Sequence, residues 1–328
     1  MYKKILVTGG AGFIGRETVK GLLNEGYDVR AFDLAEQHLR HKEKMEEISA
    51  LGNLELSYGS ILDRNAVREA MRDIDAVFHL AAMLGVKKTE DDMLGCIEVN
   101  ITGTDNVLDA AVAHSIKKFI FASSSEVYGE PDTNPINETQ STKGKTVYGV
   151  TKIAGEELTK GYHQKYPSMN YSIVRFFNTY GEGQIAQFVI TKWVLNVLQG
   201  KNPVVYGDGK QLRSYGHVED VVGGLKLILE NSISHGKTYN LGNSNQIKSL
   251  SELAQLVIDT VSPKDNLHVE LLEGFDGADR NAEREIHTRY CDTSLAHKEL
   301  GYEPKISVED GIKRIASQAK IHKDWPKS

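Results

Sequence analysis

The sequence predicts an α/β fold in which a doubly wound parallel sheet precedes a smaller C-terminal α/β region. In the first half of the chain, short apolar runs alternate with stretches of helical periodicity, which is the pattern of successive βαβ units. Beyond about residue 178 this alternation stops, and helices and short strands are mixed. We therefore expect one unit over residues 1–177 and a second over residues 178–328, with some return of the chain to the first.

Six apolar runs in the first part predict the strands of the sheet. The run at 76–82 is continuously apolar, as strands are when helices cover both faces of a parallel sheet. The predicted strands are 5–7, 27–32, 54–58, 76–82, 119–122 and 171–175, the last of which is expected to end the series of βαβ units. The predicted helices run from residue 16 to residue 26, from after Asp33 through Met45 and Ile48, and over 64–72, 99–114 and 147–166.

The second part predicts helices at 187–200, 218–230, 250–261 and 308–321, with short strands at 203–206 and 239–241. Ligands of doubly wound folds bind outside the carboxyl ends of the parallel strands. We therefore expect this second part to cap that edge of the sheet and to contact the substrate.

Composition excludes several classes of protein. The 328 residues suffice for one or two domains, and a net charge of −6 without a basic stripe argues against nucleic acid as a partner. No apolar run approaches the roughly 18 residues of a membrane helix, and the N-terminus does not resemble a signal peptide. Cys96 and Cys291 lie in no metal-binding pattern, so we expect reduced thiols in a cytoplasmic protein and no metal site.

A glycine-rich turn lies between the first predicted strand and the first predicted helix. Gly10, Gly12 and Gly15 have the spacing G-x-G-x-x-G, which lets a backbone approach a pyrophosphate at a helix N-terminus. Asp33 ends the second apolar run, where a carboxylate can accept hydrogen bonds from an adenosine ribose and would repel a 2′-phosphate. Glycine turns also occur in proteins that bind nothing, but the combination predicts a Rossmann-type site for NAD rather than NADP.

Tyr148 and Lys152 are four residues apart at the start of a predicted helix, so they share one face. A neighbouring cation favours the phenolate and lowers the pKa of the tyrosine, which can then accept a proton from a sugar hydroxyl. The same spacing recurs at Tyr206 and Lys210 around Gly-Asp-Gly, which does not form a helix, so we interpret that instance as chance. The serines at 123–125 end a predicted strand, where they either relay a proton or only satisfy a turn.

Further motifs occur in order along the chain, and together they resemble an extended short-chain dehydrogenase/reductase of the nucleotide-sugar epimerase/dehydratase family. The resemblance covers nearly the whole chain. The matching stretches are 8–15, Asp33, 79–82, Ser124 with 127–129, Tyr148 with Lys152, 175–181, 206–209 with Arg213, and 217–220.

The resemblance implies an enzyme-bound NAD that oxidises a nucleotide-diphosphate sugar at C4. It implies that Tyr148 is the base, that Lys152 lowers its pKa and holds the nicotinamide ribose, and that Ser124 assists at the O4 hydroxyl. It also implies a homodimer formed through the helices near 98–114 and 147–166. The expected cofactor contacts are Gly9, Gly12, Phe13, Ile14, Gly15, Asp33, Ser60, Ile61, Leu80, Ala81, Ala82, Tyr148, Lys152 and Phe177, and the expected substrate contacts are Ser124, Ser125, Asn178 and Arg213.

Two positions depart from the family's pattern. The family often has Gly-Asp-Ile after the third strand, where this chain has Ser60 in the middle position, and a serine can still form the hydrogen bond expected near the adenine. After residues 178–181 the usual proline is Glu182, in a loop that shapes the sugar and base pocket. The sequence therefore leaves the identity of the base and the sugar open.

Glu126, a further candidate catalytic residue, bears on the fate of the 4-keto sugar after C4 oxidation. In the family's 4,6-dehydratases a glutamate at this point removes the C5 proton, and its uronate decarboxylases also carry a glutamate here. Four outcomes stay open: C4 epimerisation, loss of water, loss of carbon dioxide, or release of the 4-keto sugar. We expect a 4-epimerase, because it needs only Tyr148, Lys152, Ser124 and a roomy pocket. A protein that binds NAD without catalysing a reaction is the remaining alternative.

Overall fold

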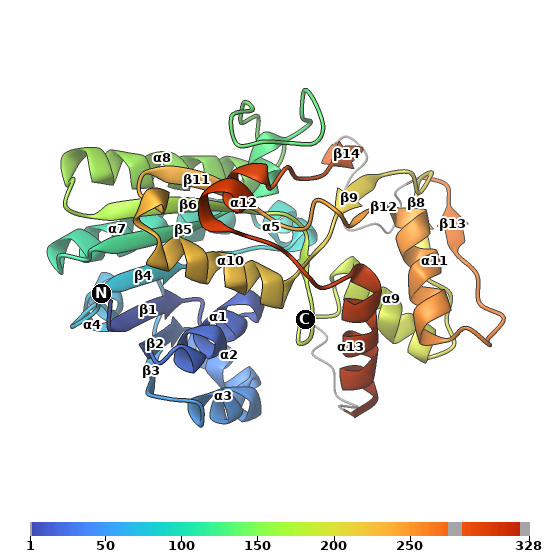
Figure 1. Cartoon of the computed structure of the whole chain (residues 1–328), viewed down its shortest axis with the longest axis horizontal. Coiled ribbons are helices and arrows are strands. Elements are labelled where there is room, and N and C mark those ends of the chain that lie inside the picture. The colour runs from blue at the N-terminus through green and yellow to red at the C-terminus, as the bar shows by residue number, and fades with distance from the viewer. Residues whose placement is uncertain (1, 275–283, 322–328) are drawn as a thin grey trace.

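The structure, a computed structural model, describes residues 2–274 and 284–321 of the chain. Seven of the described strands form one sheet in the order β3-β2-β1-β4-β5-β6-β11, and each neighbouring pair is parallel. This sheet (Figure 1) confirms the predicted doubly wound fold. Its strands are β1 (Lys4–Thr8), β2 (Asp28–Asp33), β3 (Leu54–Tyr58), β4 (Ala76–His79), β5 (Lys118–Ser124), β6 (Asn170–Phe176) and β11 (Lys237–Leu241).

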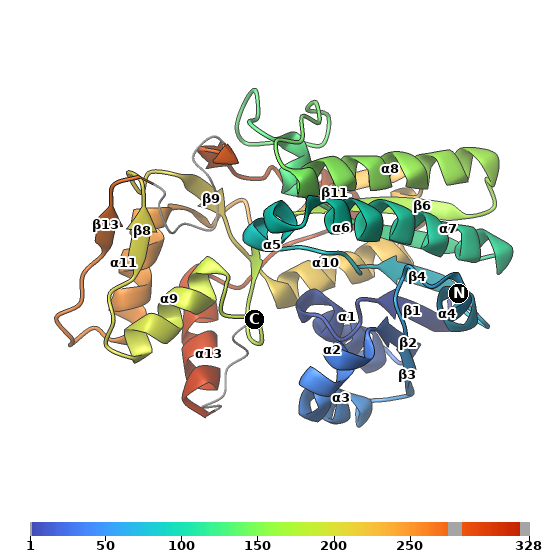
Figure 2. The ribbon, with the colours of Figure 1, turned by 180° about the vertical axis from the view of Figure 1, so that it is seen from behind.

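Helices cover both faces of the sheet because alternate strand residues point to opposite sides. Leu6 contributes to one hydrophobic core, while Ile5 and Val7 contribute to the other. Figures 1 and 2 show the two layers from opposite sides. The first face is covered by α4 (Arg64–Ala70), α7 (Gly103–Ala113) and α8 (Val147–Lys165), and the second by α1 (Phe13–Asn24), α3 (Lys42–Ser49), α10 (Val218–Glu230) and α12 (Ser294–Leu300).

The C-terminal region forms a third core around Trp193, Leu253 and Ile312. Three helices supply it, namely α9 (Val189–Leu198), α11 (Leu250–Val261) and α13 (Val308–Ile321). Short strands pair nearby: β7 (Thr179–Tyr180) with β10 (Gly216–His217), β9 (Leu212–Ser214) with β12 (Ile247–Ser249) and β14 (Thr288–Arg289), and β8 (Val204–Tyr206) with β13 (Glu270–Leu272). The predicted helices at 218–230, 250–261 and 308–321 are confirmed.

Several predictions about elements are wrong. The run at 171–175 forms β6, and a strand predicted only as part of the second region, β11, joins the sheet beside it after some 60 residues of other structure. The strand predicted over 76–82 ends at His79, since the chain then leaves the sheet toward the glycine turn. The helical stretch expected after Asp33 through Ile48 is present, divided into α2 (Ala35–Arg40) and α3. Unpredicted or altered elements are α5 (Val86–Asp91), α6 (Met93–Ile97), the π-helix η1 (Glu98–Thr102) that replaces the start of the helix expected at 99–114, and the 3₁₀ turns η2 (Ser125–Tyr128) and η3 (Ser232–Ser234).

The strand order reverses between β1 and β4, so the connections from these two strands run to opposite sides. Such a switch point creates a crevice at the carboxyl ends of the strands, where doubly wound folds bind ligands. Within residues 2–274 and 284–321, no helix is long and apolar enough to cross a membrane. In the same ranges, no group of three or more His, Cys, Asp or Glu side chains is arranged to hold a metal ion.

Candidate functional site

The glycine turn between β1 and α1 is closely packed against the chain that follows β4. Gly9 has a φ of +71°, and a Cβ at this residue would lie 2.8 Å from the amide nitrogen of Ala81. A Cβ at Gly15 would lie only 1.9 Å from the carbonyl oxygen of Gly9. Side chains at these positions would collide with the backbone of the turn and of the chain after β4, so only glycine permits a turn this tight at the N-terminus of α1, where backbone amides can receive a pyrophosphate. This cradle fits a dinucleotide.

Asp33 ends β2 beside the same turn. Its Oδ2 accepts a hydrogen bond from the Ala11 amide at 3.0 Å, and its Oδ1 accepts one from the Leu34 amide at 2.8 Å. Burial raises the pKa of Asp33, and the backbone hydrogen bonds oppose that rise. The carboxylate therefore lies at the edge of the glycine turn, in the position that suits an adenosine ribose.

The other predicted cofactor residues follow the carboxyl ends of neighbouring strands or open α1. Ser60 Oγ accepts a hydrogen bond from the Leu62 amide at 3.1 Å, and the buried Ile61 side chain packs against Gly103. Phe177 is fully buried, and its ring centroid lies 6.1 Å from that of Tyr128. The remaining members are Phe13 and Ile14 at the start of α1, Gly12 as its N-cap, and Leu80, Ala81 and Ala82 after β4.

Tyr148 and Lys152 lie on the first turns of α8, as predicted. Thr146 caps this helix, because its Oγ1 accepts a hydrogen bond from the Gly149 amide at 3.0 Å. Lys152 Nζ donates to the carbonyl oxygen of Ala122 at 2.7 Å and lies 5.7 Å from the centroid of the Tyr148 ring. Ala122 belongs to β5, which also carries Ser124, so the strand and the helix bring the serine, the tyrosine and the lysine together.

The sequence predicts a lowered pKa for Tyr148, but in the structure this pKa is raised. Burial raises the pKa of Tyr148 above its ordinary value, electrostatic interactions with Glu126 and Cys96 raise it further, and a hydrogen bond with Ser124 opposes these effects. Burial also lowers the pKa of Lys152 to about 8. The correction has a physical reason: the Lys152 amine is directed to the Ala122 carbonyl, whereas a carboxylate lies near the phenol.

Glu126 has a partner that sequence reasoning missed. Its Oε1 accepts a hydrogen bond from Arg289 Nη1 at 2.5 Å, and its Oε2 accepts one from Thr146 Oγ1 at 3.3 Å. Both members of the ion pair are buried. Arg289 Nε, also buried, has no hydrogen-bond partner within the described ranges. No local pattern joins two residues so far apart in sequence, so only the fold reveals this pair.

The predicted substrate residues are distributed over two regions. Ser125 follows β5 and is buried, and Asn178 follows β6 with a φ of +21°. Asn178 Nδ2 donates to the carbonyl oxygen of Ser214, one residue after Arg213. The guanidinium of Arg213 is held by the carboxylate of Glu285 at 2.6 Å and by the carbonyl oxygen of Ile286. Arg213 is therefore close to the chain after β6, but its guanidinium already has a carboxylate partner.

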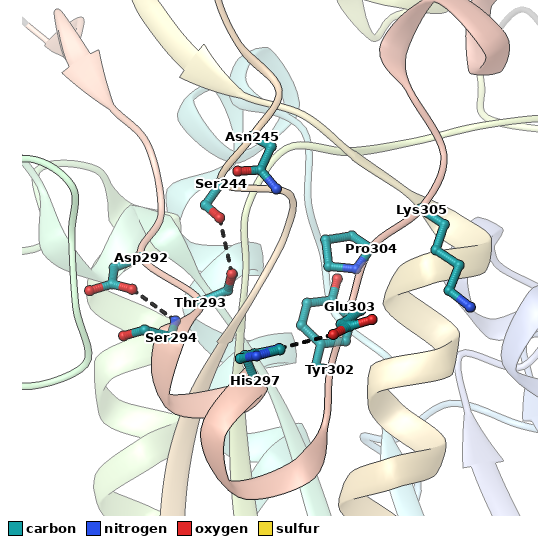
Figure 3. Close-up of a pocket in the computed structure, with 10 residues that line it drawn as sticks. All are labelled: Ser244, Asn245, Asp292, Thr293, Ser294, His297, Tyr302, Glu303, Pro304 and Lys305. Carbon is teal, nitrogen blue, oxygen red and sulfur yellow. Dashed lines mark hydrogen bonds and ion pairs between the residues drawn. The ribbon is translucent and has the colours of Figure 1, made fainter.

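A separate pocket of about 460 Å³ lies between the loop after β11 and α12 (Figure 3). Its walls are polar: Ser244 Oγ lies 3.2 Å from Thr293 Oγ1, and His297 Nδ1 lies 3.6 Å from a Glu303 oxygen. Tyr148, Lys152 and Ser124 are not among its ten lining residues. Sequence reasoning did not predict this pocket, and the catalytic candidates lie elsewhere.

Comparison with known proteins identifies the class to which this fold and site belong. The profile of the GDP-mannose 4,6 dehydratase family matches residues 6–315. A UDP-N-acetyl-alpha-D-glucosaminuronate decarboxylase from Bacillus cytotoxicus is 36% identical over 95% of this chain and 96% of its own. A putative UDP-glucose 4-epimerase from Methanocaldococcus jannaschii is 31% identical over 96% of this chain and 98% of its own.

Solved structures agree with these relatives. A UDP-glucuronic acid 4-epimerase from Bacillus cereus, in complex with UDP-glucuronic acid and NAD, has a TM-score of 0.87 at 27% identity and covers 97% of this chain and 99% of its own. A dTDP-glucose 4,6-dehydratase from Streptomyces venezuelae, with NAD bound, has a TM-score of 0.86 at 26% identity and covers 98% of each chain. The chain belongs to the GDP-mannose 4,6 dehydratase family, whose members here are NAD-dependent epimerases, dehydratases and decarboxylases of nucleotide sugars. It is an NAD-dependent enzyme of this family.

Proposed function

We propose that the protein is a nucleotide-sugar 4-epimerase that oxidises its substrate at C4. The observation that carries this choice is the state of Glu126, whose two carboxylate oxygens accept hydrogen bonds from Arg289 and Thr146. We interpret a carboxylate held in this way as a group that orders its loop rather than as the base that removes the C5 proton. Epimerisation, which needs no such base, is therefore favoured over dehydration.

The residues have distinct tasks in this reaction. When bound, NAD supplies the acceptor for the hydride of C4 and returns it to the ketone. The glycine turn and Asp33 would hold it, and Lys152 would contact its nicotinamide ribose. The deprotonated form of Tyr148 Oη removes the proton from the C4 hydroxyl, and Ser124 Oγ, which shares a hydrogen bond with Tyr148, positions that hydroxyl. Rotation of the 4-keto sugar before reduction gives the C4 epimer.

Decarboxylation of a nucleotide-linked uronic acid is the second candidate, and Arg289 favours it. This buried guanidinium brings positive charge next to Glu126, and its Nε finds no hydrogen-bond partner among the described residues. A carboxylate at C5 of the sugar would complete the hydrogen bonding of such a group. The Bacillus cytotoxicus and Bacillus cereus proteins are named for uronic acid substrates.

We also assign the nucleotide-sugar side of the site to residues 178–328. Asn178 and Arg213 are the proposed contacts to the sugar nucleotide and its phosphates, because a guanidinium pairs well with a diphosphate. In this assignment the diphosphate competes with Glu285 for Arg213. We assign the contacts to NAD to residues 1–177.

A homodimer is part of the proposal. The helices α6 and α8 lie side by side (Figure 2). Both carry exposed apolar side chains, namely Met93, Leu94 and Ile97 on α6 and Val150 on α8. Leu94 is 79% exposed, and contiguous exposed apolar patches are typical of protein–protein interfaces. These residues border the helices expected to form the interface. Light scattering on the wild type and on Leu94→Lys tests the assignment, which fails if the wild type is a monomer.

The two cysteines are buried free thiols, in keeping with a cytoplasmic enzyme.

The product mass tests the proposed reaction. Purified protein is incubated with UDP-, GDP-, CDP- and dTDP-sugars, including a uronic acid, and each product is analysed by chromatography and mass spectrometry. A new peak of unchanged mass supports the epimerase. Loss of carbon dioxide would establish the second candidate in its place, and loss of water or of two hydrogens would overturn both in favour of a dehydratase or a net dehydrogenase.

A further inference from the structure

Arg16 joins two loops that are far apart in sequence. It lies on the first turn of α1 and is 5% exposed. Its Nη1 donates to the carbonyl oxygen of Ala11, inside the glycine turn, at 2.6 Å. Its Nη2 donates to the carbonyl oxygen of Gly183, 167 residues later, at 3.0 Å. One guanidinium therefore holds the dinucleotide turn and the loop after β7 in a fixed relation.

The second of these loops continues directly from the proposed substrate residue Asn178. Gly183 has a φ of +80°, and a Cβ at this residue would lie 3.0 Å from Arg16 Nη2. The neighbouring Glu182 is fixed independently, because its Oε2 lies 2.8 Å from Nε2 of His217, the N-cap of α10. The loop thus has one anchor in the C-terminal region and one, through Arg16, in the cofactor half.

Both hydrogen bonds of Arg16 end on backbone carbonyls. The bridge therefore fixes two stretches of main chain and does not neutralise the guanidinium with a carboxylate. Burial lowers the pKa of Arg16 to about 10, and the nearby charges of Glu17 and Asp33 oppose that change, so the side chain stays charged at neutral pH. A planar guanidinium with several donors can hold two acceptors at once, which a lysine amine on its flexible stem does less well.

We propose that Arg16 is a positioning residue that couples the dinucleotide-binding turn to loop 181–184. A dinucleotide that orders the glycine turn also fixes the Ala11 carbonyl and, through Arg16, the Gly183 carbonyl. The chain that leads from Asn178 is then ordered before the nucleotide sugar arrives. By linkage, a nucleotide that orders loop 181–184 strengthens the binding of the dinucleotide by the same factor. The second step rests on the proposed substrate side of the site, while the first needs only dinucleotide binding.

Hydrogen exchange of the full-length protein with and without added NAD tests the coupling. In the wild type we expect NAD to slow amide exchange in both 9–15 and 181–184. In Arg16→Met we expect slowing in 9–15 alone, and in Arg16→Lys a partial effect in 181–184. Arg40→Met, the same change at an exposed arginine of α2, is the matched control and should behave as the wild type.

The outcomes separate positioning from mere stability. If Arg16→Met only destabilises the fold, exchange rises throughout but the NAD-dependent slowing in 181–184 persists, and the proposal is overturned. It is also overturned if the wild type shows no NAD effect in 181–184. A second measurement compares the dissociation constant of NAD with and without UDP: we expect a coupling factor of about five or more in the wild type and about one in Arg16→Met. Because neither measurement involves turnover, a wrong assignment of the reaction leaves both interpretable.

Discussion

Glu156 and Arg175 form a two-pronged ion pair in the protein interior. Glu156 Oε1 accepts a hydrogen bond from Arg175 Nε at 2.8 Å, and Oε2 accepts one from Nη2 at 2.7 Å. Ser123 Oγ donates to the same Oε1 at 2.5 Å. Glu156 lies one turn after Lys152 on α8, and Ser123 precedes Ser124 on β5. The pair therefore holds α8, which carries the base, against β6, and the Ser123 hydrogen bond holds it against β5, which carries Ser124.

Replacing Glu156 should destabilise the protein. Glu156→Gln leaves the Arg175 guanidinium buried without its counter-ion, and we expect the free energy of unfolding to fall by about 3 to 5 kcal/mol. Urea denaturation measures this change. The neighbouring Glu157 pairs with Lys160 at the surface, so Glu157→Gln should cost less than about 1 kcal/mol. Equal losses in the two variants would contradict a special role for the buried pair.

Tyr148→Phe should stop turnover while NAD stays bound. Removal of the phenol oxygen deletes the group that accepts the C4 hydroxyl proton, so we expect kcat to fall by about 10²- to 10⁴-fold. Bound NAD is measured by absorbance after denaturation of the purified variant. Tyr206→Phe, at the other Tyr-x-x-x-Lys sequence, is the control and should keep wild-type kcat. A fully active Tyr148→Phe protein would refute the assignment of the base.

Glu126→Gln should shift the pH dependence of an epimerase. The carboxylate of Glu126 is one of the causes that raise the pKa of Tyr148. Its neutral replacement therefore lowers the pKa of Tyr148, and the acid limb of kcat/KM moves to lower pH. A pH–rate profile measures the shift, with the exposed Glu130→Gln as control. If Glu126 is instead the base of a dehydratase or decarboxylase, kcat falls by about 10²-fold or more at every pH.

Lys118→Met should stabilise the protein near neutral pH. Lys118 is fully buried, and its Nζ donates to the hydroxyl oxygens of Ser172 and Ser234 at 2.7 and 2.8 Å. Burial lowers the pKa of Lys118 from 10.5 to about 7. Both hydroxyls donate to backbone carbonyls, so the serines keep hydrogen bonds when the lysine is replaced. The replacement removes a buried charge whose cost, from this pKa shift, is about 5 kcal/mol.

The stabilisation by Lys118→Met should depend on pH in a definite direction. Between pH 7 and 10.5 the unfolded chain binds a proton at Lys118 that the folded chain does not, so the wild type gains stability as pH rises. The advantage of Lys118→Met should therefore be largest below about pH 7 and should shrink toward pH 10. Thermal unfolding of both proteins across this range measures it. The exposed Lys117→Met is the control, and a difference that grows with pH would show that Lys118 is not the cause.

The parts of the site that the sequence predicts are the parts encoded by local spacing. The glycine turn, Asp33 and the Tyr148–Lys152 pair each depend on residues within a few turns of one another or at a strand end, and the structure places them at one edge of the sheet. The sequence predicts a strand at 239–241 but assigns it to the second part of the chain, whereas in the structure it is β11 of the main sheet. A short apolar run carries no information about which sheet it joins. Its partner becomes visible only when the strands are assembled.

Long-range contacts could not be predicted, because no spacing rule connects their members. Arg289 with Glu126 and Arg16 with Gly183 are such contacts. The predicted sign of the Tyr148 pKa shift is wrong for a related reason. Helical spacing places a cation near the phenol, but burial and the carboxylate of Glu126 decide the direction of the pKa shift. Glu126 is remote in sequence and near in space, so both effects are properties of the assembled fold.

During synthesis of the chain, β11 is made well after β6, the strand with which it pairs. β6 is complete at residue 176, but the strand that covers its outer edge is not made until residues 237–241 leave the ribosome. At about 5 to 20 residues per second, the apolar edge with Ile173 and Val174 stays unpaired for several seconds. An open strand edge is a template for pairing with other chains. This interval is when a nascent-chain chaperone would help most, and a fragment that ends before β11 would carry the same exposed edge permanently.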